Sequence, residues 1–327
     1  MGYHQENFKR IRAEYETKAL LAQRAADGRR EEVHQRIPEL RELDRRLSTF
    51  GLRIMKQAME GGNTQSALDQ LREENQRILE QRRQLLALHG YPEDYCKPQY
   101  ECDQCNDSGY VGIKMCVCMR RRLVEAGMES SGLGGLMKKQ SFDNFSLDYY
   151  KNNRQDYARM EQNFRKVKSY AEAFELTEQN HPKSLLFLGG TGLGKTHLST
   201  AVAKTVIERG YDVFYNSAVG MISDFECRRF GNTAAMGDAD NTERYVSCDL
   251  LILDDLGTEM VNQFTQSTLY YILNTRLNMN RPTVISTNLK ADELLKTYNE
   301  RITSRLIGEF DLVPFYGVDV RKQKLSQ

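Results

Sequence analysis

The chain has 327 residues, of which 28% are charged and 40% are hydrophobic, so it is long enough for roughly two or three domains. Its 46 Lys and Arg residues against 45 Asp and Glu give a net charge of +1, which excludes a protein held to nucleic acid by overall charge alone. It contains no run of about 18 apolar residues and has a polar start without a secretory signal pattern. We therefore expect a cytoplasmic protein with no membrane partner.

The cysteines also bear on the compartment. The chain has 7, of which five lie between Cys96 and Cys118. An odd number, clustered in one short segment, favours a reducing compartment and a metal site over a disulfide framework.

Residues 1–92 are rich in Arg, Glu, Gln and Leu, a composition typical of helices. We expect a helix over about 5–36, ended near Pro38, and then a coiled-coil-like hairpin of two helices that turns at residues 60–63. Residues at three- and four-residue spacing predict the hairpin: Leu40, Leu43, Leu47, Phe50 and Ile54, then Leu68, Leu71, Asn75 and Ile78, with Leu85 one heptad later. Packing between the helices is enough to explain any single leucine in this pattern. The region as a whole is interpreted as one that binds a partner.

Residues 93–130 are predicted to be a small zinc-binding unit with a linker. Cys102, Cys105, Cys116 and Cys118 have the spacing C-x₂-C-x₁₀-C-x-C, and four thiolates favour a closed, structural Zn²⁺ site. Two alternatives stay open: free buried thiols, or Cys96 in place of one ligand. We expect a flexible joint at residues 130–135, where Ser and Gly are frequent.

Residues 136–327 alternate between strand-like and helix-like patterns. This alternation predicts an α/β fold, with a parallel sheet flanked by crossover helices. The strands are expected at residues 184–188, 211–215, 249–253 and 282–286, with a short fifth strand near 311–316.

A glycine-rich loop follows the first of these strands. Gly189-x-x-x-x-Gly194-Lys195-Thr196 is the pattern of a P-loop, whose backbone N–H groups surround phosphate oxygens at a helix N-terminus. Lys195 is expected to reach the β- and γ-phosphates of ATP, and the Thr196 hydroxyl to ligate Mg²⁺. A chance match is the alternative, but the preceding strand argues against it. The further residues expected to contact ATP are Gly190, Thr191, Gly192, Leu193 and His197.

Acidic and amide side chains end two later strands. Asp254 and Asp255 follow an apolar run and have the form of a Walker B motif, with Asp254 holding Mg²⁺ through water and Asp255 acting on the attacking water. Asn288 is a candidate to bind the γ-phosphate or that water. An N-cap of the following helix is the alternative for Asn288.

Three arginines near the C-terminus are candidate nucleotide contacts. Arg301 and Arg305 are four residues apart, so they share a helix face, from which a guanidinium can reach the γ-phosphate of a neighbouring subunit. A surface salt bridge with Glu300 or Glu309 is the alternative. Arg321 is a candidate sensor of the same subunit's nucleotide.

Together these residues resemble the AAA+ ATPases of the bacterial replicative helicase loader family, the DnaC/DnaI type, and their relative IstB. The resemblance spans roughly residues 140 to 322 and implies an AAA+ domain with Asn288 as sensor 1, Arg305 as arginine finger and Arg321 as sensor 2. It also places Phe142 and Phe145 before the P-loop. The cysteine cluster after a helical region looks more like the DnaI type, in which a zinc-containing N-terminal domain binds the hexameric helicase.

The resemblance further implies a helix near Met221 to Phe230 that contacts single-stranded DNA, through Phe225, Arg228 and Arg229 together with Phe230. A packed helix with a basic edge is the alternative. The leading hypothesis is an ATPase that self-associates with ATP at subunit interfaces, binds the replicative DNA helicase and places it on single-stranded DNA at replication initiation. The alternatives are an IstB-like transposition helper that binds DNA and a transposase, and a non-hydrolysing ATP-bound adaptor.

Overall fold

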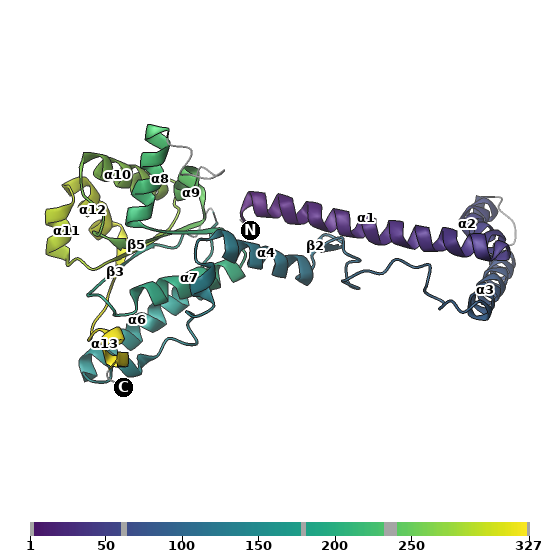
Figure 1. The fold of residues 1–327 in the computed structure, drawn as a ribbon, viewed down its shortest axis with the longest axis horizontal. Helices are drawn as coiled ribbons and strands as arrows, with labels where there is room; N and C mark the ends of the chain where they lie inside the picture. The colour runs from purple at the N-terminus through teal and green to yellow at the C-terminus, as the bar shows by residue number, and fades with distance from the viewer. Residues whose placement is uncertain (1–2, 60–63, 178–180, 232–240, 326–327) are drawn as a thin grey trace. The chain divides into compact units, whose positions relative to one another are not determined.

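The computed structural model describes residues 3–59, 64–177, 181–231 and 241–325 (Figure 1). The chain divides into two compact units, one of residues 12–118 and the other of residues 1–11 together with 119–327. This division differs from the expected ranges 1–92, 93–130 and 136–327, because the cysteine segment shares a unit with the helices before it. The expected turn at residues 60–63 lies outside the described residues.

Three long helices make up most of the N-terminal unit: α1 (Gln5–Arg36), α2 (Pro38–Met59) and α3 (Thr64–Leu88). Pro38 is the first residue of α2, where a missing N–H costs no hydrogen bond. Ion pairs join α2 and α3 as an antiparallel hairpin, between Arg46 and Glu74 at 3.1 Å and between Arg82 and Asp44 at 2.7 Å. The predicted helices are therefore present.

A small apolar cluster holds these helices together. It contains Val33, Ile37, Leu40, Leu86 and Cys96. The side chains of Ile54 and Leu68, which belong to the predicted pattern, lie outside those described. None of the helices in the described part of the chain has the length and apolar character needed to cross a membrane.

The cysteine segment follows α3. It contains a two-stranded antiparallel hairpin, β1 (Tyr110–Val111) and β2 (Lys114–Met115), and leads into α4 (Val117–Ser130).

A five-stranded sheet is the centre of the C-terminal unit: β3 (Ser184–Leu188), β4 (Val213–Ser217), β5 (Leu250–Leu256), β6 (Thr283–Thr287) and β7 (Phe310–Pro314). The order is β4-β5-β6-β3-β7, and every pair is parallel. This confirms the predicted α/β fold. The observed strand bounds differ from those expected by at most a few residues.

Helices cover both faces of the sheet (Figure 1), which is why its strands are continuous apolar runs. Leu185 and Phe187 point to the face that α6 (Arg154–Glu172) and α7 (Lys195–Glu208) cover. Leu186 points to the other face, with α8 (Ala218–Phe230) and α10 (Gln263–Asn278). The shorter helices are α5 (Gly134–Met137), α9 (Arg244–Ser247), α11 (Ala291–Thr297), α12 (Glu300–Gly308) and α13 (Val320–Leu325).

The expected flexible joint at residues 130–135 is wrong. The carbonyl of Ser131 accepts a 2.9 Å hydrogen bond from the backbone N–H of Tyr215 on β4, and Leu133 is buried in the core. Gly132 has φ +85, and a Cβ there would lie 2.8 Å from the carbonyl oxygen of Tyr215. The glycine is therefore needed for close packing against the sheet rather than for mobility.

Candidate nucleotide and metal sites

The glycine-rich loop lies between β3 and α7, as predicted. Gly192 and Gly194 have φ values of +75 and +88, which glycine adopts without strain. A Cβ on Gly192 would lie 1.8 Å from the carboxylate of Asp319, and a Cβ on Gly194 would lie 2.8 Å from the ring of Phe145. Asp319 and Phe145 thus pack closely against the loop. The shape of the loop therefore depends on glycine at both positions.

Lys195 is buried at the start of α7, with 5% of its surface exposed. Its Nζ donates to the carbonyls of Gly189 and Gly190 at 2.8 Å each and to Oδ1 of Asn288 at 2.6 Å. Burial lowers the pKa of Lys195, although Asp255 and Asp254 oppose this effect. The structure therefore brings Asn288 from the end of β6 to the P-loop lysine, because β6 lies between β3 and β5 in the sheet.

Asp254 lies on β5 and is 4% exposed. Its Oδ2 accepts hydrogen bonds from Thr196 Oγ1 at 2.9 Å and from the Tyr215 hydroxyl at 2.8 Å, and its Oδ1 accepts one from the Ser286 hydroxyl. Thr196 and Asp254 thus meet, although the sequence places them far apart. Their hard oxygen atoms suit Mg²⁺, which prefers carboxylate and hydroxyl ligands supplemented by water and phosphate.

Asp255 has φ +55 and interrupts the regular pairing of β5 with β6. Its backbone N–H donates to Ser286 Oγ at 3.0 Å, and Nδ2 of Asn288 lies 3.5 Å from its Oδ1. Burial raises the pKa of Asp255, and the nearby charge of Asp254 raises it further. The carboxylate is thereby turned toward the same space as Asn288, where it can act on a water molecule.

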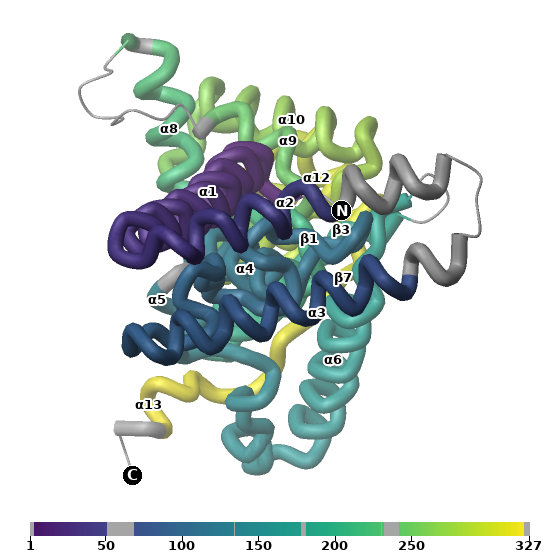
Figure 2. The backbone as a smooth tube through the Cα atoms, turned by 90° about the vertical axis from the view of Figure 1, so that its right-hand side faces the viewer, coloured from purple at the N-terminus to yellow at the C-terminus, as the bar shows by residue number. Residues whose placement is uncertain are grey.

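A cavity of about 240 Å³ contains most of these groups. Its lining joins the P-loop to the segment of residues 140–150 and to α13. Helix α13 follows β7 and lies near the C-terminus (Figure 2). Val320 at the start of α13 donates its N–H to the carbonyl of Gly192 at 3.0 Å. The lining includes Gln140, Asn144, Phe145, Ser146, Tyr149, Tyr150, Thr191, Gly192, Leu193, Gly194, Lys195, Thr196, His197, Asp255, Asn288, Val320 and Arg321.

The structure defines the contacts of two residues near the cavity, Phe142 and His197, which the sequence did not indicate. Phe142 is buried in the core with its ring 5.8 Å from that of Phe164, so only Phe145 of the two phenylalanines lines the cavity. His197 contacts the carbonyl of Ser141 at 2.9 Å and Oδ1 of Asn144 at 3.0 Å through Nε2. His197 therefore fastens this segment to α7 beside the P-loop.

Arg301 and Arg305 lie on α12 and do not line the cavity. Arg305 donates to Asn274 Oδ1 at 2.7 Å and to the Tyr270 hydroxyl at 3.1 Å, and its guanidinium lies over the Tyr270 ring. It forms no ion pair with Glu300 or Glu309, both of which the structure describes. Action of either arginine on a neighbouring chain stays a prediction.

The helix expected to contact single-stranded DNA is α8. Phe225 is half-buried and packs with its ring 5.5 Å from that of Tyr245. Its contact with single-stranded DNA stays a prediction. Arg229 lies over the ring of Phe264, and Arg228 donates to Thr242. The side chain of Phe230 lies outside those described.

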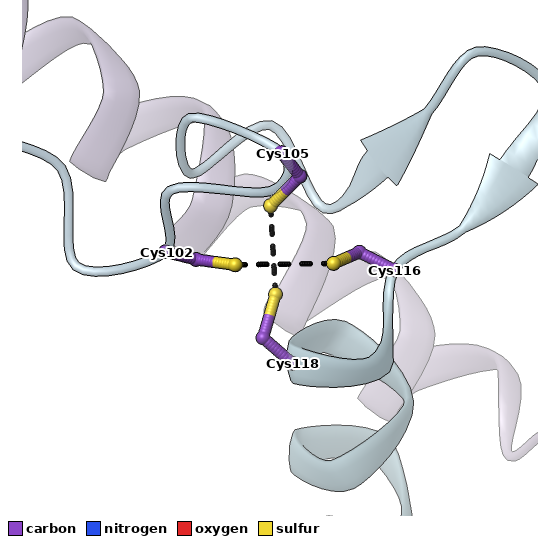
Figure 3. Close-up of side chains that lie close together, drawn as sticks. All are labelled: Cys102, Cys105, Cys116 and Cys118. Carbon is purple, nitrogen blue, oxygen red and sulfur yellow. Dashed lines mark hydrogen bonds between the residues drawn. The ribbon is translucent and has the colours of Figure 1, made fainter.

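Four cysteine sulfurs of the N-terminal unit point toward one another (Figure 3). The Sγ atoms of Cys102, Cys105, Cys116 and Cys118 lie within 4.8 Å of one another, with 3.5 Å between Cys105 and Cys118 and 3.9 Å between Cys102 and Cys116. Zn–S bonds of about 2.3 Å in a tetrahedron place sulfurs roughly 3.8 Å apart. The four residues therefore fit a metal ion.

The local backbone supports this arrangement. Asn106 and Asp107 have φ values of +50 and +55, which form a tight turn between the two cysteine pairs, and the Asp107 carboxylate accepts the N–H of Cys102 at 2.9 Å. Backbone N–H groups of Cys105 and Gln104 lower the pKa of Cys102 to about 7. Cys96 is not a fifth candidate, because it is buried in the apolar cluster with Val33 and Leu86.

Comparison with known proteins relates the C-terminal unit to a family. The family model of the IstB-like ATP binding protein matches residues 146–327. The phage-like element PBSX protein XkdC of Bacillus subtilis is 26% identical over 239 residues, which are 69% of this chain and 84% of that protein.

The replicative helicase loader DnaC of Escherichia coli is also similar, with 26% identity over 145 residues. That match takes in 43% of this chain and 55% of DnaC, so the chain spans about half the length of this relative. The crystal structure of the DnaC helicase loader is 20% identical and covers 56% of this chain and 99% of its own, with a TM-score of 0.45.

Proposed function

Because this chain belongs to the family of IstB-like ATP-binding proteins, we propose that it is an ATPase that loads a replicative DNA helicase onto single-stranded DNA. The main support for ATP binding and hydrolysis is that residues of three predicted motifs lie together at one cavity. Lys195 contacts Asn288, Thr196 contacts Asp254, and Asp255 lines the same space.

Each side chain has a distinct role in the proposed hydrolysis. Lys195 binds the β- and γ-phosphates, and Mg²⁺, held through Thr196 and Asp254, neutralises phosphate charge when bound. Asp255 takes a proton from the attacking water, while Asn288 orients that water or the γ-phosphate. Arg321 lines the cavity and contacts the nucleotide of its own chain, whereas Arg305 acts on the nucleotide of a neighbour.

The helicase as partner is supported by two separate features. One relative is named as a replicative helicase loader, and the chain carries a helical unit with a four-cysteine cluster that fits zinc. We infer that this unit binds the hexameric helicase, with Zn²⁺ in a structural role, and that hydrolysis times its release onto single-stranded DNA.

Transposition is the second candidate function, because the chain matches the IstB-like family and resembles a relative that acts in transposition. In that case the protein binds duplex DNA and a transposase in place of a helicase. A third candidate, an adaptor that holds ATP without hydrolysis, is disfavoured by the pair of acids at Asp254 and Asp255.

Co-purification of the full chain with the host's replicative helicase tests the proposal. Leu88 is 79% exposed on α3 and lines an apolar groove with Leu43 and Leu85. Leu88→Arg is expected to weaken helicase binding without unfolding the hairpin. Leu79→Arg is the matched control, because Leu79 is also exposed on α3 but does not line the groove.

Helicase capture by the wild type and by Leu79→Arg, but not by Leu88→Arg, supports loading through the helical unit. Cooperative coating of duplex DNA without any helicase binding would favour the transposition candidate. A steady-state ATPase assay with single-stranded DNA present distinguishes the loading and transposition candidates from the adaptor, because the adaptor would not hydrolyse ATP.

A further inference from the structure

Three hydroxyl groups surround the carboxylate of Asp254, and two of them belong to no predicted nucleotide-binding motif of the chain. Thr196 is part of the P-loop, and Ser286 lies on the adjacent strand β6. The third donor is Tyr215, from β4. We propose that Tyr215 is a positioning residue that fixes the direction of the Asp254 carboxylate for Mg²⁺.

Tyr215 is held at both its backbone and its side chain. Its backbone N–H donates to the carbonyl of Ser131 at 2.9 Å, and its hydroxyl donates to Asp254 Oδ2 at 2.8 Å. The ring between these two points packs against the core cluster that includes Leu133 and Leu250. A tyrosine has few rotatable bonds, so a ring fixed in this way places its hydroxyl with little freedom.

Asp254 depends on these donors for its orientation. A carboxylate offers about four lone-pair sites, and here hydroxyl groups fill three of them. Among the described residues, Asp254 forms no ion pair with a lysine or arginine, so the donors in direct contact with its carboxylate are these neutral hydroxyl groups. Loss of the Tyr215 hydroxyl leaves Oδ2 with the Thr196 hydroxyl as its single donor among these three. The carboxylate can then rotate, and Oδ2 loses its fixed direction.

A purely structural role of Tyr215 makes a different prediction. If the hydroxyl only stabilised the fold, its removal would weaken nucleotide binding equally with and without Mg²⁺. If the hydroxyl orients Asp254, its removal weakens nucleotide binding only when Mg²⁺ is present. The dependence of nucleotide affinity on Mg²⁺ therefore separates the two roles.

The test uses the full chain with Tyr215→Phe, which keeps the ring and removes the hydroxyl. Binding of a fluorescent ATP analogue is titrated against Mg²⁺ and repeated in EDTA. Tyr211→Phe is the control, because Tyr211 packs against the same cluster, with its ring 5.1 Å from Phe174. We expect the Mg²⁺ concentration for half-maximal enhancement of binding to rise about tenfold in Tyr215→Phe, the scale of lost outer-shell contacts at metal sites. Affinity in EDTA and the behaviour of Tyr211→Phe should match the wild type.

An unchanged Mg²⁺ titration in Tyr215→Phe would overturn the proposal, as would an equal loss of affinity in EDTA. If this variant does not fold, Ser286→Ala removes a donor from the other oxygen of Asp254 and should shift the Mg²⁺ titration in the same direction. The inference rests on the proposed ATPase site, but its measurement is binding rather than turnover. A wild type that binds Mg²⁺ and nucleotide without hydrolysis would refute the proposed function and leave the role of Tyr215 testable.

Discussion

Replacement of Asp255 by asparagine separates the chemistry of this carboxylate from its backbone. Asp255 has φ +55, in the left-handed region that asparagine and aspartate enter more readily than other residues with a side chain. Asp255→Asn therefore keeps the backbone and the contact with Asn288 but removes the charge. Asp255→Ala carries an added backbone penalty of about 1–2 kcal/mol. A loss of activity in the alanine variant could therefore come from lost stability as well as from the lost carboxylate.

The expected loss of activity follows from the assigned role. A positioned general base contributes about 10²- to 10⁴-fold to the rate, so ATP turnover by Asp255→Asn should fall by at least about 10²-fold. Nucleotide binding should remain, because Lys195 and the P-loop are intact. Steady-state phosphate release and equilibrium binding of a fluorescent nucleotide measure the two effects separately.

The stability of the same variant provides an internal check. Burial and Asp254 raise the pKa of Asp255, so between its ordinary value and the raised value the native state binds more protons than the unfolded state. The free energy of unfolding contributed by this group therefore falls as pH rises through that range, and the fall should be smaller in Asp255→Asn. Normal turnover with intact binding would refute the assignment of Asp255 as the base.

Three further predictions concern the other sites. Lys195→Ala should abolish nucleotide binding in a fluorescence titration, because the loop loses its only lysine, while circular dichroism shows a folded chain; binding at wild-type affinity would contradict the P-loop assignment. Arg305→Ala should slow ATP turnover in assemblies and recover when mixed with Asp255→Asn subunits, and a lack of recovery would argue against action across an interface. Cys116→Ser should remove bound zinc, measured by elemental analysis, and lower the thermal stability of the N-terminal unit, whereas Cys227→Ser should keep the metal; equal zinc content in both variants would exclude the cysteine cluster as the site.

Much of the nucleotide site could be predicted because its motifs lie at the ends of parallel strands. A P-loop after β3 and acids on β5 must reach the same edge of the sheet, and Asn288 at the end of β6 follows from the same rule. Tyr215 and Ser286 could not be found in this way. A tyrosine and a serine within apolar strands have no spacing signal, and their role depends on the register of β4, β5 and β6.

Packing explains why the expectation of a flexible joint was wrong. The Ser and Gly residues near 130–135 have the composition of a linker, yet Gly132 is required because its backbone lies against Tyr215. Phe225 has the chemistry of a base-stacking residue, and the structure shows it half-buried against Tyr245, which its sequence position does not indicate. Composition alone does not distinguish an exposed side chain from one that tertiary contacts bury.

The path of the chain between its two units is that of a domain insertion. Residues 12–118 leave and re-enter a unit formed by residues on both sides of them, and Asn7 of α1 donates hydrogen bonds to Ala126 and Ser130 of α4 at 3.1 and 2.8 Å. Removal of everything before residue 130 would therefore strip two helical segments from the ATP-binding unit. An internal excision that joins α1 near Ile11 to α4 near Met119 is the deletion that follows the architecture, and proteolysis within the insertion should leave two fragments that remain associated.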